Sequence, residues 1–88
     1  MLLTGYHGTN PRAANKILRE GFKPDSWFAY HIEDARAFGG PVIFEVNFDA
    51  DKWPRDCIGG PDWQMHHPKR IPPSRIREIH GRLTNDDF

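Results

Sequence analysis

The sequence has little of what several classes of protein require. Its 88 residues include one cysteine, Cys57. A lone cysteine excludes an internal disulfide and fits a reducing compartment. No apolar run approaches the roughly 20 residues of a membrane span, and the first residues lack the basic start and long apolar core of a signal peptide. We therefore expect a cytoplasmic protein that has no membrane partner.

The charge balance has no dominant sign. The chain carries 12 basic and 12 acidic side chains, so the formal net charge is +0, which does not favour a general binder of nucleic acid or membrane surfaces. The hydrophobic fraction is low, at 38%, but 6 Phe, 3 Trp and 2 Tyr can each bury a large area. A chain of this length holds one core, so we expect a single domain over residues 1–88.

Hydrophobic periodicity and turn residues predict an α+β fold. Two short helices are expected, one that begins at Asn10-Pro11 and ends before Gly21, and one over residues 32–38. Period-2 alternation predicts strands over residues 2–7, 26–30, 42–48, 62–67 and 75–83. We take 42–48 as the central strand and 49–61 as a long surface loop. The elements suggest a small split antiparallel sheet of about five or six strands.

The stretch His7-Gly8-Thr9 closes the first predicted strand. A strand that ends at His-Gly brings an imidazole and a bare backbone to the same exposed point. Glycine has no Cβ, so a flat ligand can lie against its N–H and C=O, while His7 offers a ring nitrogen to a hydroxyl. An incidental histidine at a turn is the alternative, and only the positions of later motifs favour a ligand site.

Four motifs in order resemble the ADP-ribosyltransferase fold. They are His7-Gly8, Trp27-Phe28-Ala29 at a strand end, Phe38 after the following helix, and Gln64 on a late strand. The resemblance covers residues 6 to 79, and parts of the sequence are similar to those of small bacterial and phage members of the family. Enzymes of that family cleave nicotinamide from NAD and transfer the ADP-ribose. The resemblance therefore implies NAD as a substrate, and a protein or nucleic-acid acceptor that the sequence does not identify.

The same resemblance implies a role for each of these positions. His7 is expected to bond the adenosine-side ribose, and the backbone of Gly8 is expected to contact the nicotinamide amide. Thr9 belongs to the same expected NAD-binding segment. Trp27 and Phe38 are expected to enclose the nicotinamide. A cationic pyridinium between two aromatic faces gains stacking and cation–π attraction, so this arrangement is physically sound.

Gln64 departs from the family's usual glutamate, which bonds the nicotinamide ribose and stabilises an oxocarbenium-like transition state. An amide can hold the hydroxyl but carries no charge, and electrostatic stabilisation is often the largest contribution to catalysis. Asp62 lies two residues earlier on the same predicted face and is a candidate source of the missing charge. We expect a mono-ADP-ribosyltransferase in which His7, Gln64 and Asp62 are the catalytic residues.

Two other classes of function stay open. One is a non-catalytic module that binds NAD, ADP-ribose, another nucleotide or a protein through the same cleft. The other is a ribonuclease that uses His7 and His66. Trp27 and Phe38 also have a purely structural alternative as core aromatics. No metal site is expected, because the adjacent His66 and His67 face opposite ways in a regular strand.

Overall fold

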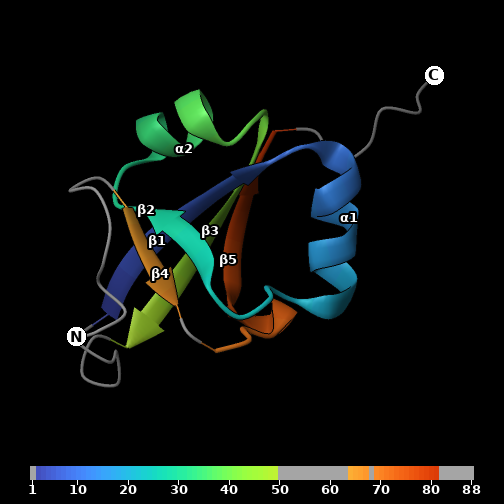
Figure 1. The fold of residues 1–88 in the computed structure, drawn as a ribbon, viewed down its shortest axis with the longest axis vertical. Helices are drawn as coiled ribbons and strands as arrows, with labels where there is room; N and C mark the ends of the chain where they lie inside the picture. The colour runs from blue at the N-terminus through green and yellow to red at the C-terminus, as the bar shows by residue number, and fades with distance from the viewer. Residues whose placement is uncertain (1, 50–63, 68, 82–88) are drawn as a thin grey trace.

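A computed structural model describes residues 2–49, 64–67 and 69–81, which form an α+β fold (Figure 1). Its strands make one 5-stranded antiparallel sheet in the order β4-β2-β1-β3-β5. The elements are β1 (Leu2–Thr9), α1 (Pro11–Glu20), β2 (Ser26–Ala29), α2 (Ile32–Phe38), β3 (Val42–Asp49), β4 (Gln64–His67), a 3₁₀ turn (Pro73–Arg75) and β5 (Ile76–His80). Neither α1 nor α2 has the length and hydropathy that a membrane-spanning helix requires.

The central strand is β1, so the prediction that residues 42–48 occupy the centre is wrong. β1 pairs with β3 along its whole length, from Leu2 opposite Asp49 to Thr9 opposite Val42. β3 in turn lies between β1 and β5. Both β1 and β3 are interior strands. Their apolar alternation alone does not show which of the two lies at the centre of the sheet.

The strand β1 also continues past the point where we expected it to end. Gly8 and Thr9 pair with Ile43 and Val42, so His7 lies inside the strand rather than at an exposed end. Adding a Cβ to Gly8 would place it 2.3 Å from the carbonyl oxygen of Ala35, so α2 can approach β1 this closely only over a glycine. Glycine at position 8 thus has a structural reason, independent of any ligand.

Both helices are confirmed. The side chain of Asn10 accepts a hydrogen bond of 2.8 Å from the backbone N–H of Ala13, and Pro11 takes the first helical position. Gly21 ends α1 with a positive φ of 83° and donates its N–H to the carbonyl of Ile17 at 2.7 Å. The helix α2 has the predicted bounds, Ile32–Phe38.

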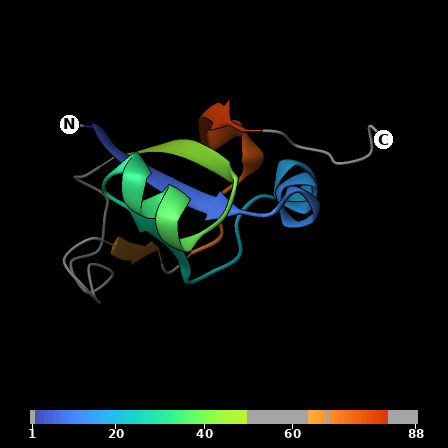
Figure 2. The same cartoon turned by 90° about the horizontal axis from the view of Figure 1, so that it is seen from above.

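The two faces of the sheet carry separate hydrophobic clusters, and α1 and α2 lie well apart (Figure 2). Residues of α1 pack with Phe22, Phe28 and Phe44. Residues of α2 pack with Ala29 and Ile43 on the opposite face. Because Phe44 pairs with His7 and Ile43 with Gly8, His7 belongs to the α1 face and Gly8 to the α2 face.

The remaining predicted strands are shorter than expected. The strand at 26–30 ends at Ala29, and the final strand begins at Ile76, after the 3₁₀ turn, and ends at His80. Of the strand predicted over 62–67, the structure describes residues 64–67, which form β4. Asp62 and the predicted loop beyond Asp49 lie outside the described residues.

Candidate functional site

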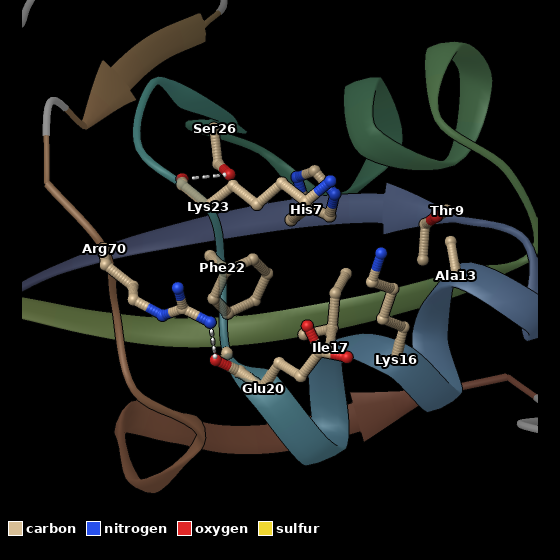
Figure 3. Close-up of a pocket in the computed structure, with 11 residues that line it drawn as sticks. His7, Thr9, Ala13, Lys16, Ile17, Glu20, Phe22, Lys23, Ser26 and Arg70 are labelled. Atoms are coloured by element: carbon tan, nitrogen blue, oxygen red, sulfur yellow. Dashed lines mark hydrogen bonds between the residues drawn. The ribbon is translucent and has the colours of Figure 1, made fainter.

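A pocket of about 220 Å³ opens between β1, α1 and the segment that leads into β2 (Figure 3). His7, Ile17 and Phe22 are among the residues that line it, and Thr9 and Ser26 contribute hydroxyl groups. It is smaller than the roughly 300–1,000 Å³ of pockets that enclose a whole drug-sized ligand. The pocket is therefore large enough for one part of such a ligand rather than for all of it.

His7 forms one wall of this pocket and also connects β1 to β2. Its Nδ1 lies 2.7 Å from the backbone carbonyl oxygen of Trp27. Its ring lies 5.0 Å from the ring of Trp27, 5.3 Å from that of Phe22 and 5.7 Å from that of Phe28, measured between centroids. The imidazole is thus held in one orientation by a hydrogen bond and three aromatic neighbours.

The hydrogen bond to Trp27 fixes which nitrogen of His7 carries the proton. A carbonyl oxygen only accepts, so Nδ1 must donate, and Nε2 of the neutral ring is left as an acceptor. Burial lowers the pKa of His7 below its usual 6.5, and the bond to the Trp27 carbonyl opposes this effect only in part. At neutral pH the ring is therefore uncharged, the form in which Nε2 can accept a hydrogen bond from a hydroxyl group.

Three cationic side chains surround the pocket, those of Lys16, Lys23 and Arg70, against one carboxylate, that of Glu20. In Figure 3 the side chains of Lys16 and Lys23 extend toward His7. Arg70 donates a hydrogen bond of 3.1 Å to the backbone carbonyl of Glu20, which fixes it beside the end of α1. The excess of positive charge favours an anionic ligand.

Sequence reasoning missed these cations. Lys16 and Glu20 are four residues apart on α1, on the side of the helix that carries Ala13 and Ile17, so the helical period offered a weak signal. Arg70 had none. It reaches the pocket through the pairing of Phe22 with Ile71, which no local pattern encodes.

Trp27 and Gln64 lie on the other face of the sheet. Ala29 pairs with Gln64 and belongs to the α2 cluster, and Trp27, two residues earlier in β2, packs against the same cluster. Phe38 lies at the end of α2 with 67% of its surface exposed, so it is not a core residue. Trp27 is half-buried. The structure thus brings Trp27 next to His7 and places Gln64 opposite Ala29, on the same face as Trp27.

Gly8 and Thr9 occupy different sides of β1. Thr9 lines the pocket on the α1 face. Gly8 is buried, because Ala35 of α2 and Gly39 just after it lie against its Cα and its carbonyl group. The proposed second carboxylate, Asp62, lies outside the described residues.

The lowered pKa of His7 predicts a specific dependence of stability on pH. Between the folded pKa and 6.5 the unfolded chain binds a proton that the folded protein does not bind. The free energy of unfolding therefore falls as the pH is lowered through 6.5, by at most about 1.4 kcal/mol per pH unit from one group. Urea denaturation of the wild type and of His7→Gln between neutral and acidic pH measures this dependence.

The wild type should lose more stability on acidification than His7→Gln. The matched control is His31→Gln, at an exposed position before α2, which should keep the wild-type slope. Equal slopes for the wild type and His7→Gln would show that His7 titrates alike in the folded and unfolded protein, contrary to its burial.

Comparison with known proteins does not identify a family for this chain. The chain matches no protein-family model, no curated protein and no solved structure. The resemblance to ADP-ribosyltransferases therefore depends on the sequence motifs alone.

Proposed function

We propose that the protein is a minimal ADP-ribosyltransferase-like domain that binds NAD where β1 and β2 diverge. One observation carries the proposal. His7 bonds the Trp27 carbonyl at 2.7 Å and at the same time lines a pocket rimmed by cations. In this proposal a ligand that contacts His7 occupies the pocket on the α1 face and reaches toward Trp27 and Gln64, which lie on the other face of the sheet.

The divergence of the two strands gives the ligand its path. β1 pairs with β2 only at Tyr6 opposite Ala29, whereas it pairs with β3 along its entire length. Beyond that position the side chain of His7, rather than the backbone of β1, bonds β2. We interpret this divergence as the counterpart of the split antiparallel sheet that the resemblance implies.

The pocket on the α1 face suits the adenosine ribose and the diphosphate. Nε2 of the neutral His7 accepts from a ribose hydroxyl. Lys16, Lys23 and Arg70 provide positive charge for the diphosphate, and charge-assisted hydrogen bonds to phosphate are stronger than neutral ones. Thr9 and Ser26 add hydroxyl groups at the edges of the pocket.

The α2 face suits the nicotinamide. The half-buried ring of Trp27 provides one aromatic surface, and the exposed ring of Phe38 at the end of α2 provides a second. A positively charged pyridinium between them gains stacking and cation–π attraction. The resemblance assigns the contact with the carboxamide to the backbone of Gly8, which in the structure pairs with Ile43 and is buried beneath Ala35 and Gly39.

Gln64 would act at the ribose next to the nicotinamide. In the transfer reaction the bond from the ribose C1′ to the nicotinamide nitrogen breaks and its electron pair leaves with neutral nicotinamide. A nucleophile of the acceptor then bonds C1′ and releases its proton. The amide of Gln64 can hold a ribose hydroxyl but cannot stabilise the developing positive charge as a carboxylate does. Asp62 stays a candidate for that role.

A non-catalytic NAD-binding module is the second candidate function, and the neutral side chain at position 64 is the observation that favours it. The ribonuclease alternative has less support. His66 pairs with Trp27 in β4, on the opposite face of the sheet from His7, whereas acid and base in such an enzyme converge on one phosphodiester.

The binding proposal predicts that NAD quenches the tryptophan fluorescence and that Trp27→Ala weakens NAD binding. Loss of one aromatic stack should cost about 1 kcal/mol, roughly a fivefold increase in Kd. Lys16→Ala should also weaken binding, because it removes a cation beside the pocket. Isothermal titration calorimetry measures both effects.

The control for the loss of a positive charge is Lys69→Ala. Lys69 is exposed, follows β4 and does not line the pocket, so this variant should keep the wild-type Kd. Circular dichroism must show that each variant is folded. A folded Trp27→Ala protein that binds NAD as tightly as the wild type removes Trp27 from the site. Cleavage of RNA in the absence of NAD would instead favour the ribonuclease alternative.

Gln64→Glu separates catalysis from binding. A carboxylate at this position acts on the transition state more than on the ground state, so it should raise the rate of NAD hydrolysis and leave the Kd for NAD similar. The release of nicotinamide by the wild type, Gln64→Glu and the control Gln64→Ala measures the effect. If NAD binds but neither the wild type nor Gln64→Glu releases nicotinamide, the transferase proposal fails and the binding module stands.

A further inference from the structure

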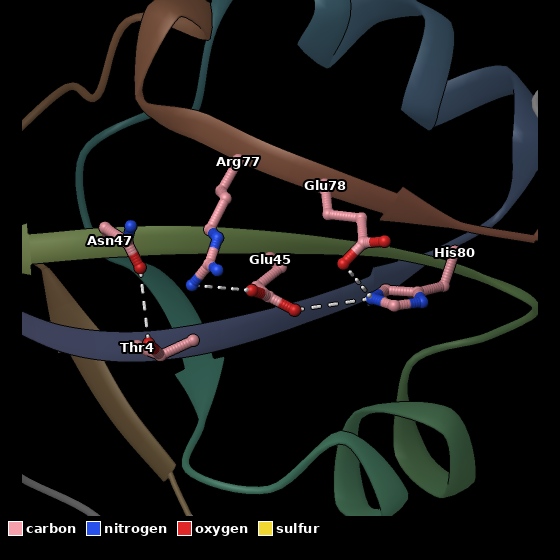
Figure 4. A network of polar contacts seen from close by, with 6 residues as sticks. All are labelled: Thr4, Glu45, Asn47, Arg77, Glu78 and His80. Carbon is pink, nitrogen blue, oxygen red and sulfur yellow. Dashed lines mark hydrogen bonds and ion pairs between the residues drawn. The ribbon is translucent and has the colours of Figure 1, made fainter.

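A second cluster of chemically active side chains lies away from the pocket, on β3 and β5 (Figure 4). It consists of Glu45, Glu78 and His80. Glu45 pairs directly with Glu78 in the ladder, and Ile43, two residues before Glu45, pairs with His80. All three residues therefore project from the α2 face of the sheet, the face opposite the pocket. The NAD proposal uses none of them.

The distances in this cluster match those of a metal site. Nε2 of His80 lies 3.4 Å from Oε1 of Glu45 and 3.7 Å from Oε2 of Glu78. The three candidate ligand atoms all lie within 4.8 Å of one another. A tetrahedral ion with bonds of about 2.0–2.2 Å separates its ligand atoms by about 3.3–3.6 Å. Only small side-chain movements would be needed to close the site around an ion.

The electrostatics of the cluster also favour a cation. Like charges directly opposite each other in a sheet are destabilising, and Glu45 and Glu78 are such a pair. Glu45 is buried, with 9% of its surface exposed, so water screens its charge poorly. The nearest guanidinium, that of Arg77, lies 3.5 Å from the other oxygen of Glu45, Oε2, and its own side chain is 63% exposed. Arg77 thus orients Glu45 and leaves Oε1 toward the imidazole.

We propose that Glu45, Glu78 and His80 bind a transition-metal ion of the Zn²⁺ class, with one coordination position open. The imidazole ligand favours Zn²⁺ over Mg²⁺ and Ca²⁺, which prefer oxygen ligands alone. Such an ion joins the edge strand β5 to β3 and removes the repulsion between the two carboxylates. This site departs from the sequence-based expectation that the protein binds no metal.

Titration of ZnCl₂ into untagged, metal-free protein tests the proposal by calorimetry, and Co²⁺ provides the absorption spectrum of a tetrahedral site. The wild type should bind one ion and unfold at a higher temperature with Zn²⁺ present. Loss of a ligand should cost more than the roughly 10–100-fold that loss of a supporting hydrogen bond costs. His80→Ala and Glu78→Gln, both at positions partly open to water, should therefore bind Zn²⁺ at least about tenfold more weakly.

Two variants serve as matched controls. His67→Ala removes a histidine of β4, and Glu33→Gln removes a carboxylate of α2, and neither belongs to the cluster. Both should keep the wild-type affinity for Zn²⁺. The proposal is overturned if the wild type shows no saturable binding below about 1 mM Zn²⁺. It is equally overturned if folded His80→Ala and Glu78→Gln bind as tightly as the wild type.

Discussion

The arrangement of the candidate site depends on one hydrogen bond, from Nδ1 of His7 to the carbonyl oxygen of Trp27. It joins β1 and β2 where their backbone pairing has ended at Tyr6 opposite Ala29. It also fixes the tautomer of a buried imidazole, so that Nε2 is left as an acceptor. A histidine without this bond could rotate, and neither the acceptor nor the contact with Trp27 would be defined.

The sheet divides the chemistry of the protein between its two faces. His7, Phe22 and the cations of the pocket lie on the α1 face. Trp27, Gln64 and the cluster around Glu45 lie on the α2 face. Glycine at position 8 lets α2 pack closely against β1. The residues of the two faces meet where β1 and β2 diverge, because His7 bonds the backbone of Trp27 there. The proposed NAD site uses that connection, whereas the proposed metal site lies beside it on β3 and β5.

Local signals in the sequence were sufficient for the helices and for most of the strands. Asn10, Pro11 and Gly21 define α1 through their own conformational preferences, and the apolar alternation of residues 42–48 defines β3. What the sequence did not predict depends on contacts between distant residues. The extension of β1 to Thr9 comes from its pairing with Val42, and the approach of Arg70 to the pocket comes from the pairing of Phe22 with Ile71. The structure does bring His7 and Trp27 into contact, and the resemblance had assigned both residues to one ligand.

The protonation state of His7 tests the central claim most directly. Long-range ¹H–¹⁵N correlation of the histidine side chains at neutral pH distinguishes the two neutral tautomers from the imidazolium, and His7→Gln assigns the signals. We predict the Nδ1–H tautomer for His7, with Nε2 unprotonated. The ¹⁵N chemical shift of Nε2 should change when NAD is added. An Nε2–H tautomer, or a protonated ring at neutral pH, would contradict the account, because Nε2 could then no longer accept a hydrogen bond from a ribose hydroxyl.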